Sequence, residues 1–166
     1  YNTTFPTSEP HPWRTKRAAD PGFGKYYRDR YGSAESIPNG YFTSACSPLI
    51  YMDDALPGLN NQLLACAPAQ NFVHRAEVKR DGVLLNIRRL NVKTKIEFLT
   101  SRDIWFHPIH LSIGPEGAIY IADFYREIIE DYSAIPRYLQ QQYGLDDGRD
   151  HGRLWRLTHN LSLIHI

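Results

Sequence analysis

Residues 72–90 read FVHRAEVKRDGVLLNIRRL, and this stretch decides the fold. Apolar and polar residues alternate along its first half, which is the period of a half-buried β-strand. The dipeptide Asp81-Gly82 is a strong hairpin signal, so residues 84–90 are expected to return antiparallel to the first strand. Two shorter apolar segments, residues 49–51 and 62–66, come before this hairpin. The four segments together predict an antiparallel β-meander.

A second series of strand-like segments follows along the chain. Residues 109–113 and 118–123 are rich in Ile and flank the turn sequence GPEG at 114–117. Residues 126–129 are expected to form a third strand, and residues 153–157 a fourth.

A short helix is expected between these last two strands. Residues 136–147 contain Pro136, which suits the first turn of a helix, and Gly144, which can end one. We therefore predict one short helical insertion in a chain that is otherwise built from strands.

The two series share one plan of four short strands, and repeated four-stranded units are typical of a β-propeller. A blade takes roughly 40–50 residues and a closed ring needs about four blades or more. We therefore predict an all-β fold, a partial β-propeller with about two four-stranded blades. Residues 41–160 would form two C-terminal blades. Residues 1–40, rich in Pro, Gly and Ser, would be an irregular lead-in from the preceding part of the propeller.

Composition argues against several functional classes. The 166 residues include 19 Lys+Arg and 18 Asp+Glu, so the formal net charge of +1 favours no nucleic-acid partner. Apolar runs of four or five residues are too short for a membrane span. Two cysteines exclude a four-cysteine zinc site, and no CxxCH motif attaches haem within this chain. We expect no metal site.

The last six residues, 161–166, read LSLIHI. This hexapeptide is one translation of CTG-TCT-CTT-ATA-CAC-ATC, the end of a transposase adapter used in sequencing libraries. We therefore expect residues 161–166 not to be native, and we exclude them from the fold.

A run of longer motifs resembles one family. The motifs occur in this order: FTSACSPLIY at 42–51, CAPAQNFVHR at 66–75, EFLTSRDIWF at 97–106, GPEGAIYIADFYR at 114–126 and GRLWRL at 152–157. Over about residues 40–158 the chain is similar to the propeller of large bacterial proteins that carry a membrane-bound dehydrogenase domain.

This resemblance implies a distant similarity to the soluble quinoprotein sugar dehydrogenases, whose cofactor is the anionic quinone PQQ. It implies a periplasmic or secreted multidomain protein that oxidises or binds a carbohydrate-type substrate. Its partners would be further propeller blades of the same chain and a haem-c domain downstream.

One face of such a propeller is expected to carry the ligand site. In every blade the start of the first strand and the end of the second strand lie at this face, so polar and aromatic groups converge there. In the first unit these are Ser44, Gln70, Asn71 and His74; in the second they are Trp105, His107, Asp123, Tyr125 and Arg126. We take Asn71 and the five residues of the second unit as ligand-binding candidates and assign no catalytic residue.

Structural roles are also open for several of these residues. Asp123 could cap the turn after its strand, with Arg126 as its ion-pair partner. His74 could be a packed or exposed strand residue. The quinone of the sugar dehydrogenases is held by cations, but the matching positions here hold Gln70 and the string at 105–109. We therefore expect no dehydrogenase activity from this chain alone.

A non-catalytic propeller is the alternative to a dehydrogenase. Such a scaffold would bind a carbohydrate or a protein, with Trp13, Trp105 and Tyr125 as stacking surfaces. Asp123 and Asn71 would then bind hydroxyl groups.

Cys46 and Cys66 are expected to form a disulfide. If Tyr51 pairs near Gln62, the same register places Cys46 opposite Cys66 or its neighbour. Directly facing strand residues have Cα atoms about 4.5–5.5 Å apart, which is within disulfide range. The alternative is a pair of buried thiols that act as small apolar residues. A disulfide would agree with the oxidising compartment that the resemblance implies.

Overall fold

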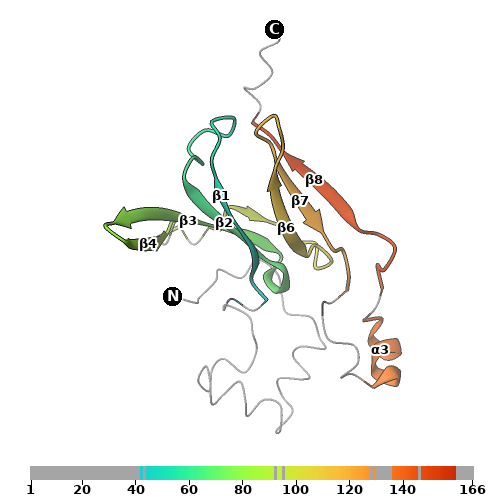
Figure 1. Ribbon diagram of the computed structural model, residues 1–166. Coiled ribbons are helices and arrows are strands. Elements are labelled where there is room, and N and C mark those ends of the chain that lie inside the picture. Colours follow the sequence, from blue (N-terminus) through green and yellow to red (C-terminus); the bar gives the residue numbers. More distant parts are fainter. Residues whose placement is uncertain are drawn as a thin grey trace, which may run out of the picture.

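The computed structural model of the chain describes residues 42, 44–91, 93–94, 96–127, 129, 136–145 and 147–159. The expected lead-in at 1–40, which includes Trp13, and the expected adapter residues at 161–166 lie outside the described residues. In the described part, the fold is all-β, as the alternating pattern predicts: two antiparallel sheets, with one short α-helix and one 3-10 turn (Figure 1).

The first sheet is the predicted meander. Its strands lie in chain order: β1 (Cys46–Tyr51), β2 (Gln62–Ala67), β3 (Phe72–Asp81) and β4 (Leu84–Arg89). A two-residue strand that was not expected, β5 (Leu99–Thr100), pairs with the start of β3. The short 3-10 turn η2 (Pro68–Gln70) joins β2 to β3 and ends at Asn71, whose φ of 59° is left-handed.

The β3–β4 hairpin forms at the predicted dipeptide. Asp81 pairs with Leu84, and Gly82 takes a φ of +59°, which a residue with a Cβ adopts at a cost. Because β3 is longer than β1 and β2, the far half of the hairpin projects beyond the rest of the sheet (Figure 1).

The second sheet consists of β6 (Pro108–Ile113), β7 (Ile119–Asp123) and β8 (Arg153–Leu157). The helix α3 (Arg137–Tyr143) lies between β7 and β8 in the chain and ends at Gly144 in the left-handed conformation, as expected.

The prediction of a strand at 126–129 is wrong. Arg126 and Glu127 lie outside any strand, and β8 pairs directly with β7. The expected strand does not form because its first backbone N–H groups find other acceptors: Arg126 donates to the Trp105 carbonyl at 3.2 Å, and Glu127 to the Asp147 carbonyl at 3.2 Å. The second sheet therefore has three strands in the described part of the chain rather than four.

The two sheets share one apolar core. Tyr51, Leu64 and Val73 of the first sheet pack with Leu111 and Ile121 of the second, and all five are buried. The first strands of the sheets, β1 and β6, lie side by side (Figure 1). Burial of these side chains stabilises the fold by about 1.5–3 kcal/mol each.

Hydrogen bonds from β1 join the sheets along this contact. The buried Tyr51 hydroxyl donates to the Gly117 carbonyl at 2.6 Å. Ser47 Oγ accepts the Leu111 N–H at 2.8 Å, and the Cys46 thiol donates to the Ile109 carbonyl at 3.3 Å. Two of these bonds connect β1 to β6, and the third connects β1 to the turn between β6 and β7.

Cys46 faces Cys66 across β1 and β2, and Tyr51 faces Gln62, so the predicted register is present. Both cysteines are free thiols in the structure, and the expected disulfide is absent from it. Burial, followed by the neighbouring Cys46, raises the pKa of the Cys66 thiol from 9.0 to about 12. Because the two cysteines face each other, a disulfide between them stays a prediction for the oxidised protein.

No helix in the described part of the chain combines the length and the apolar character that crossing a membrane requires.

We predict that Cys46 and Cys66 form a disulfide when the protein is purified from an oxidising compartment. The two residues already face each other, and closing a loop of this size would stabilise the fold by roughly 3 kcal/mol. Mass spectrometry after alkylation under non-reducing conditions checks this. Two alkylated cysteines in the folded protein would contradict it.

In the reduced protein we predict a loss of stability at high pH. The folded-state pKa of Cys66 lies above the unfolded value of 9.0, so folding favours the protonated thiol. This contribution is complete below pH 9 and is lost as the pH rises toward about 12. Urea unfolding across this range, with Cys66→Ala as the control, checks it. Equal pH dependence in both proteins would show that the thiol contributes nothing.

Candidate functional site

Asp123, at the end of β7, is the centre of a buried hydrogen-bond cluster. Its Oδ1 accepts the backbone N–H of His107 at 2.9 Å and that of Tyr125 at 3.0 Å. Its Oδ2 accepts Nε of Arg153 at 2.8 Å and the indole Nε1–H of Trp155 at 3.0 Å. Four donors therefore occupy the carboxylate, which caps the turn after β7 and joins β7 to β8.

The ion-pair partner of Asp123 is Arg153, not Arg126. Arg153 also reaches Asp103, with Nη2 3.2 Å from Oδ2. The Arg126 guanidinium instead lies over the ring of Phe124, with 4.6 Å between its Cζ and the ring centroid. The Asp123–Arg126 pair, one of the structural roles that the sequence left open, is not formed, because Arg153 lies in register opposite Asp123.

Two aromatic rings flank Arg153, and a third ring packs against one of them. Its Cζ lies 3.5 Å from the ring centroid of Tyr125 and 4.9 Å from that of Trp155. The ring of Trp105 meets that of Tyr125 edge to face, with centroids 5.4 Å apart. The structure therefore brings together three predicted residues, Trp105, Asp123 and Tyr125, around an arginine that the prediction missed.

His107 and Asn71 are buried and have structural contacts. His107 Nδ1 lies 2.7 Å from the Pro68 carbonyl, so this nitrogen carries the proton and donates it. Asn71 Nδ2 donates to the carbonyls of Ile104 and Phe106 at 3.1 and 2.7 Å. Both side chains tie the turn between β2 and β3 to the segment before β6.

His74 lies apart from this cluster. It is buried, with Nδ1 2.6 Å from Glu97 Oε2, and Arg89 Nη2 lies 3.4 Å from Glu97 Oε1. Neighbouring strand residues point to opposite faces, and Val73 packs in the core between the sheets. The triad of His74, Arg89 and Glu97 therefore belongs to the other face of the first sheet. Of the remaining first-unit residues, Gln70 is buried and Ser44 is exposed.

A cavity of about 380 Å³ lies next to the Arg153 cluster, between the two sheets. One wall comes from β5 and the segment that follows it, and the other from β7 and β8. The lining residues are Leu99, Thr100, Ser101, Asp103, Phe106, Ile121, Arg153, Trp155, Arg156 and Leu157. This volume is within the range of small-molecule sites.

The cavity combines apolar side chains with a few polar groups, which come from both walls. Leu99, Ile121 and Leu157 also contact the common core. Trp155 is 45 % exposed, so part of its indole ring is available to a ligand. These side chains can stack on a ligand and exchange hydrogen bonds with it. No group of three His, Cys, Asp or Glu side chains that could hold a metal occurs among the described residues.

Arg153, Trp155 and Asp103 are the residues that sequence reasoning missed. The sequence did contain a signal for Arg153 and Trp155. Both alternate with Leu157 along the motif GRLWRL, so the three residues share one face of β8. No signal in the sequence pointed to Asp103, which comes from a connecting segment.

We predict that Asp123→Ala lowers the free energy of unfolding by about 3 kcal/mol or more, because it leaves Arg153 and two backbone N–H groups without their acceptor. Arg126→Ala, the matched control, should cost less than about 1 kcal/mol because, among the described residues, it removes the cation–π contact with Phe124 and no acceptor of a hydrogen bond. Urea unfolding of both variants checks this. Equal losses would show that Asp123 is not a structural centre.

Comparison with known proteins assigns the chain to a family. No curated protein and no solved structure matches the chain. One family model, described as "Domain of unknown function (DUF7133)", matches residues 5–161. That range covers almost the whole chain, and the protein therefore belongs to the family described as Domain of unknown function (DUF7133).

Proposed function

We propose that the chain supplies two neighbouring blades of a β-propeller and binds a carbohydrate-type ligand, as a binding module rather than as an oxidising centre. The observation that carries the proposal is the cavity of about 380 Å³ between the sheets, with a partly exposed indole ring on one wall and polar groups beside it.

The arrangement of the sheets supports the propeller. Each sheet is an antiparallel meander in chain order, and the first strands, β1 and β6, lie side by side (Figure 1). Blades of a propeller stand around a central channel, so that neighbouring first strands are adjacent. The resemblance of the longer motifs to the bacterial dehydrogenase-domain propellers points the same way.

The cavity suits a neutral sugar. Trp155 offers an aromatic face to the apolar side of a pyranose ring, and Thr100, Ser101 and Asp103 can exchange hydrogen bonds with hydroxyl groups. The charges nearby nearly balance, because Arg153 lies between the carboxylates of Asp103 and Asp123 and the other lining cation, Arg156, pairs with Glu116. An anionic ligand would therefore gain little from this site.

The residues present do not fit the anionic quinone of the sugar dehydrogenases. The two positions that resemblance assigns to its cations hold Gln70 and the segment around His107. Both side chains are 5 % exposed, and the His107 ring donates to the Pro68 carbonyl. An amide carries no charge, and neither buried side chain offers the access that a bound PQQ requires. We therefore derive no oxidation step in this chain.

The setting that we propose is a periplasmic or secreted protein in which further blades, and a haem-c domain downstream, accompany this module. The facing cysteines support an oxidising compartment.

We predict that Trp155→Ala weakens sugar binding at least about tenfold, because it removes the stacking surface. Trp155→Phe keeps a ring but loses the Nε1–H bond to Asp123, so it should bind within about threefold of the unchanged chain. Leu154→Ala, on the opposite face of β8, is the matched control and should change nothing.

Saturation-transfer NMR and isothermal calorimetry with glucose, galactose and their disaccharides measure these affinities, and circular dichroism confirms that each variant is folded. Two results would refute the proposal: no binding by the unchanged chain at millimolar sugar, or equal binding by Trp155→Ala and Leu154→Ala.

A further inference from the structure

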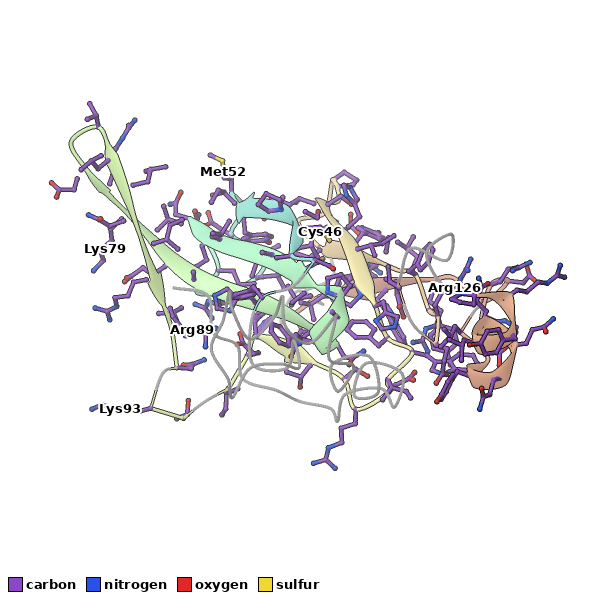
Figure 2. The ribbon with its side chains drawn as sticks, turned by 90° about the horizontal axis from the view of Figure 1, so that it is seen from below. Cys46, Met52, Lys79, Arg89, Lys93 and Arg126 are labelled. Atoms are coloured by element: carbon purple, nitrogen blue, oxygen red, sulfur yellow. The ribbon has the colours of Figure 1, made fainter. Side chains whose placement is uncertain are left out.

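The strand β4 leaves an unusual amount of apolar surface exposed. Val83 is 97 % exposed, Leu84 64 %, Leu85 63 % and Ile87 49 %. Within the described part of the chain, β4 pairs with β3 alone, so residues 84–88 meet no other described strand along their outer edge. Figure 2 shows the hairpin projecting as an arm, with Lys79 along it and Arg89 at its base. Exposed apolar edge strands are prone to pair with another chain.

The two faces of this arm differ in chemistry. Val78 pairs with Ile87 and Arg80 with Leu85, so these four residues share one face, which is mainly apolar. Lys79 and Arg88 lie on the other face near Glu77, whose Oε2 is 3.5 Å from Lys79 Nζ and 3.7 Å from Arg88 Nε. Residues 77–88 hold three cations against the two carboxylates of Glu77 and Asp81, a net charge of +1, and Arg89 pairs with the buried Glu97. The arm therefore has no strong attraction for an acidic partner.

We propose that the edge of β4 binds a second copy of this chain, by antiparallel pairing of the two β4 strands about Asn86. A two-fold axis perpendicular to the sheet keeps matching faces together. Leu85 then lies opposite Ile87 of the partner copy, and Ile87 opposite Leu85 of the partner copy. On the other face Leu84 lies opposite Arg88 of the partner copy, and the two Asn86 side chains meet at the axis.

The sequence of β4 favours this register over its neighbours. If one β4 strand shifts by one residue against the other, the apolar face of one copy lies on the same side of the sheet as the charged face of the partner copy. Moving the axis from Asn86 to Ile87 places Leu85 opposite Arg89 of the partner copy. The register about Asn86 keeps two apolar pairs and no directly opposed like charges.

The self-complementary strand explains why the occupant is a second copy. An isologous contact uses the same edge on both chains and closes after two copies, so it covers both exposed β4 edges at once. Only five of the six residues of β4 pair in this register, so the interface is small. We therefore expect a weak dimer, with a dissociation constant of about 10–100 µM.

Sedimentation velocity of the full chain over about 1–300 µM tests this, because the range spans the expected dissociation constant. The unchanged chain should pass from monomer to dimer. Leu85→Lys/Ile87→Lys places ammonium groups opposite each other across the axis and should remain monomeric throughout. Lys79→Gln, on the charged face of β3, is the matched control and should dimerise like the unchanged chain.

A charge-paired variant separates this register from unspecific association. In Leu85→Glu/Ile87→Lys a carboxylate at position 85 lies opposite an ammonium at position 87 of the partner copy, so dimerisation should return to within about fivefold of the unchanged chain. The proposal is overturned if the unchanged chain stays monomeric, if the double-lysine variant still dimerises while folded by circular dichroism, or if the charge-paired variant behaves like the double-lysine variant. The proposal is also overturned if the unchanged chain forms oligomers larger than dimers and all of these variants form them equally.

Discussion

The contact between β1 and β6 is the constraint on which the rest of the structure depends. Hydrogen bonds from Cys46, Ser47 and Tyr51 cross from the first sheet to the second, and the core of both sheets closes behind them. Because this contact is made by the first strand of each meander, the later strands diverge from it. The cavity between β5 and β8 follows from that divergence, so the candidate site is a product of how the sheets join.

The sequence allowed the first sheet to be predicted almost completely, because its signals are local. Asp81-Gly82 defines the hairpin, and alternation defines the strands on either side. The register of β1 against β2 could be predicted because one hairpin connection joins them. The strand expected at 126–129 failed for the opposite reason. Its apolar residues fit a strand, but distant acceptors at Trp105 and Asp147 take the backbone N–H groups of Arg126 and Glu127.

The candidate site was predicted in part, and the reason is similar. Trp105, Asp123 and Tyr125 are close in sequence or at a strand end, and they do meet. Arg153 enters only through the pairing of β8 with β7, which the sequence does not reveal. His107 and Asn71, which were also expected to bind ligand, hold backbone carbonyls, and a role toward a ligand stays a prediction for both. A polar residue after a strand is as useful for capping a turn as for binding a ligand.

The long connection between β7 and β8 has a consequence for the order of folding. Strands β1 to β4, like β6 and β7, follow one another through connections of ten residues or fewer, so their contacts form at small loop-closure cost. Strand β8 has to close the loop of residues 124–152 before Arg153 can meet Asp123. It should therefore dock late and detach first, and hydrogen exchange should be fastest there among the strands of the second sheet. Since β8 forms one wall of the cavity, a bound ligand would slow that exchange.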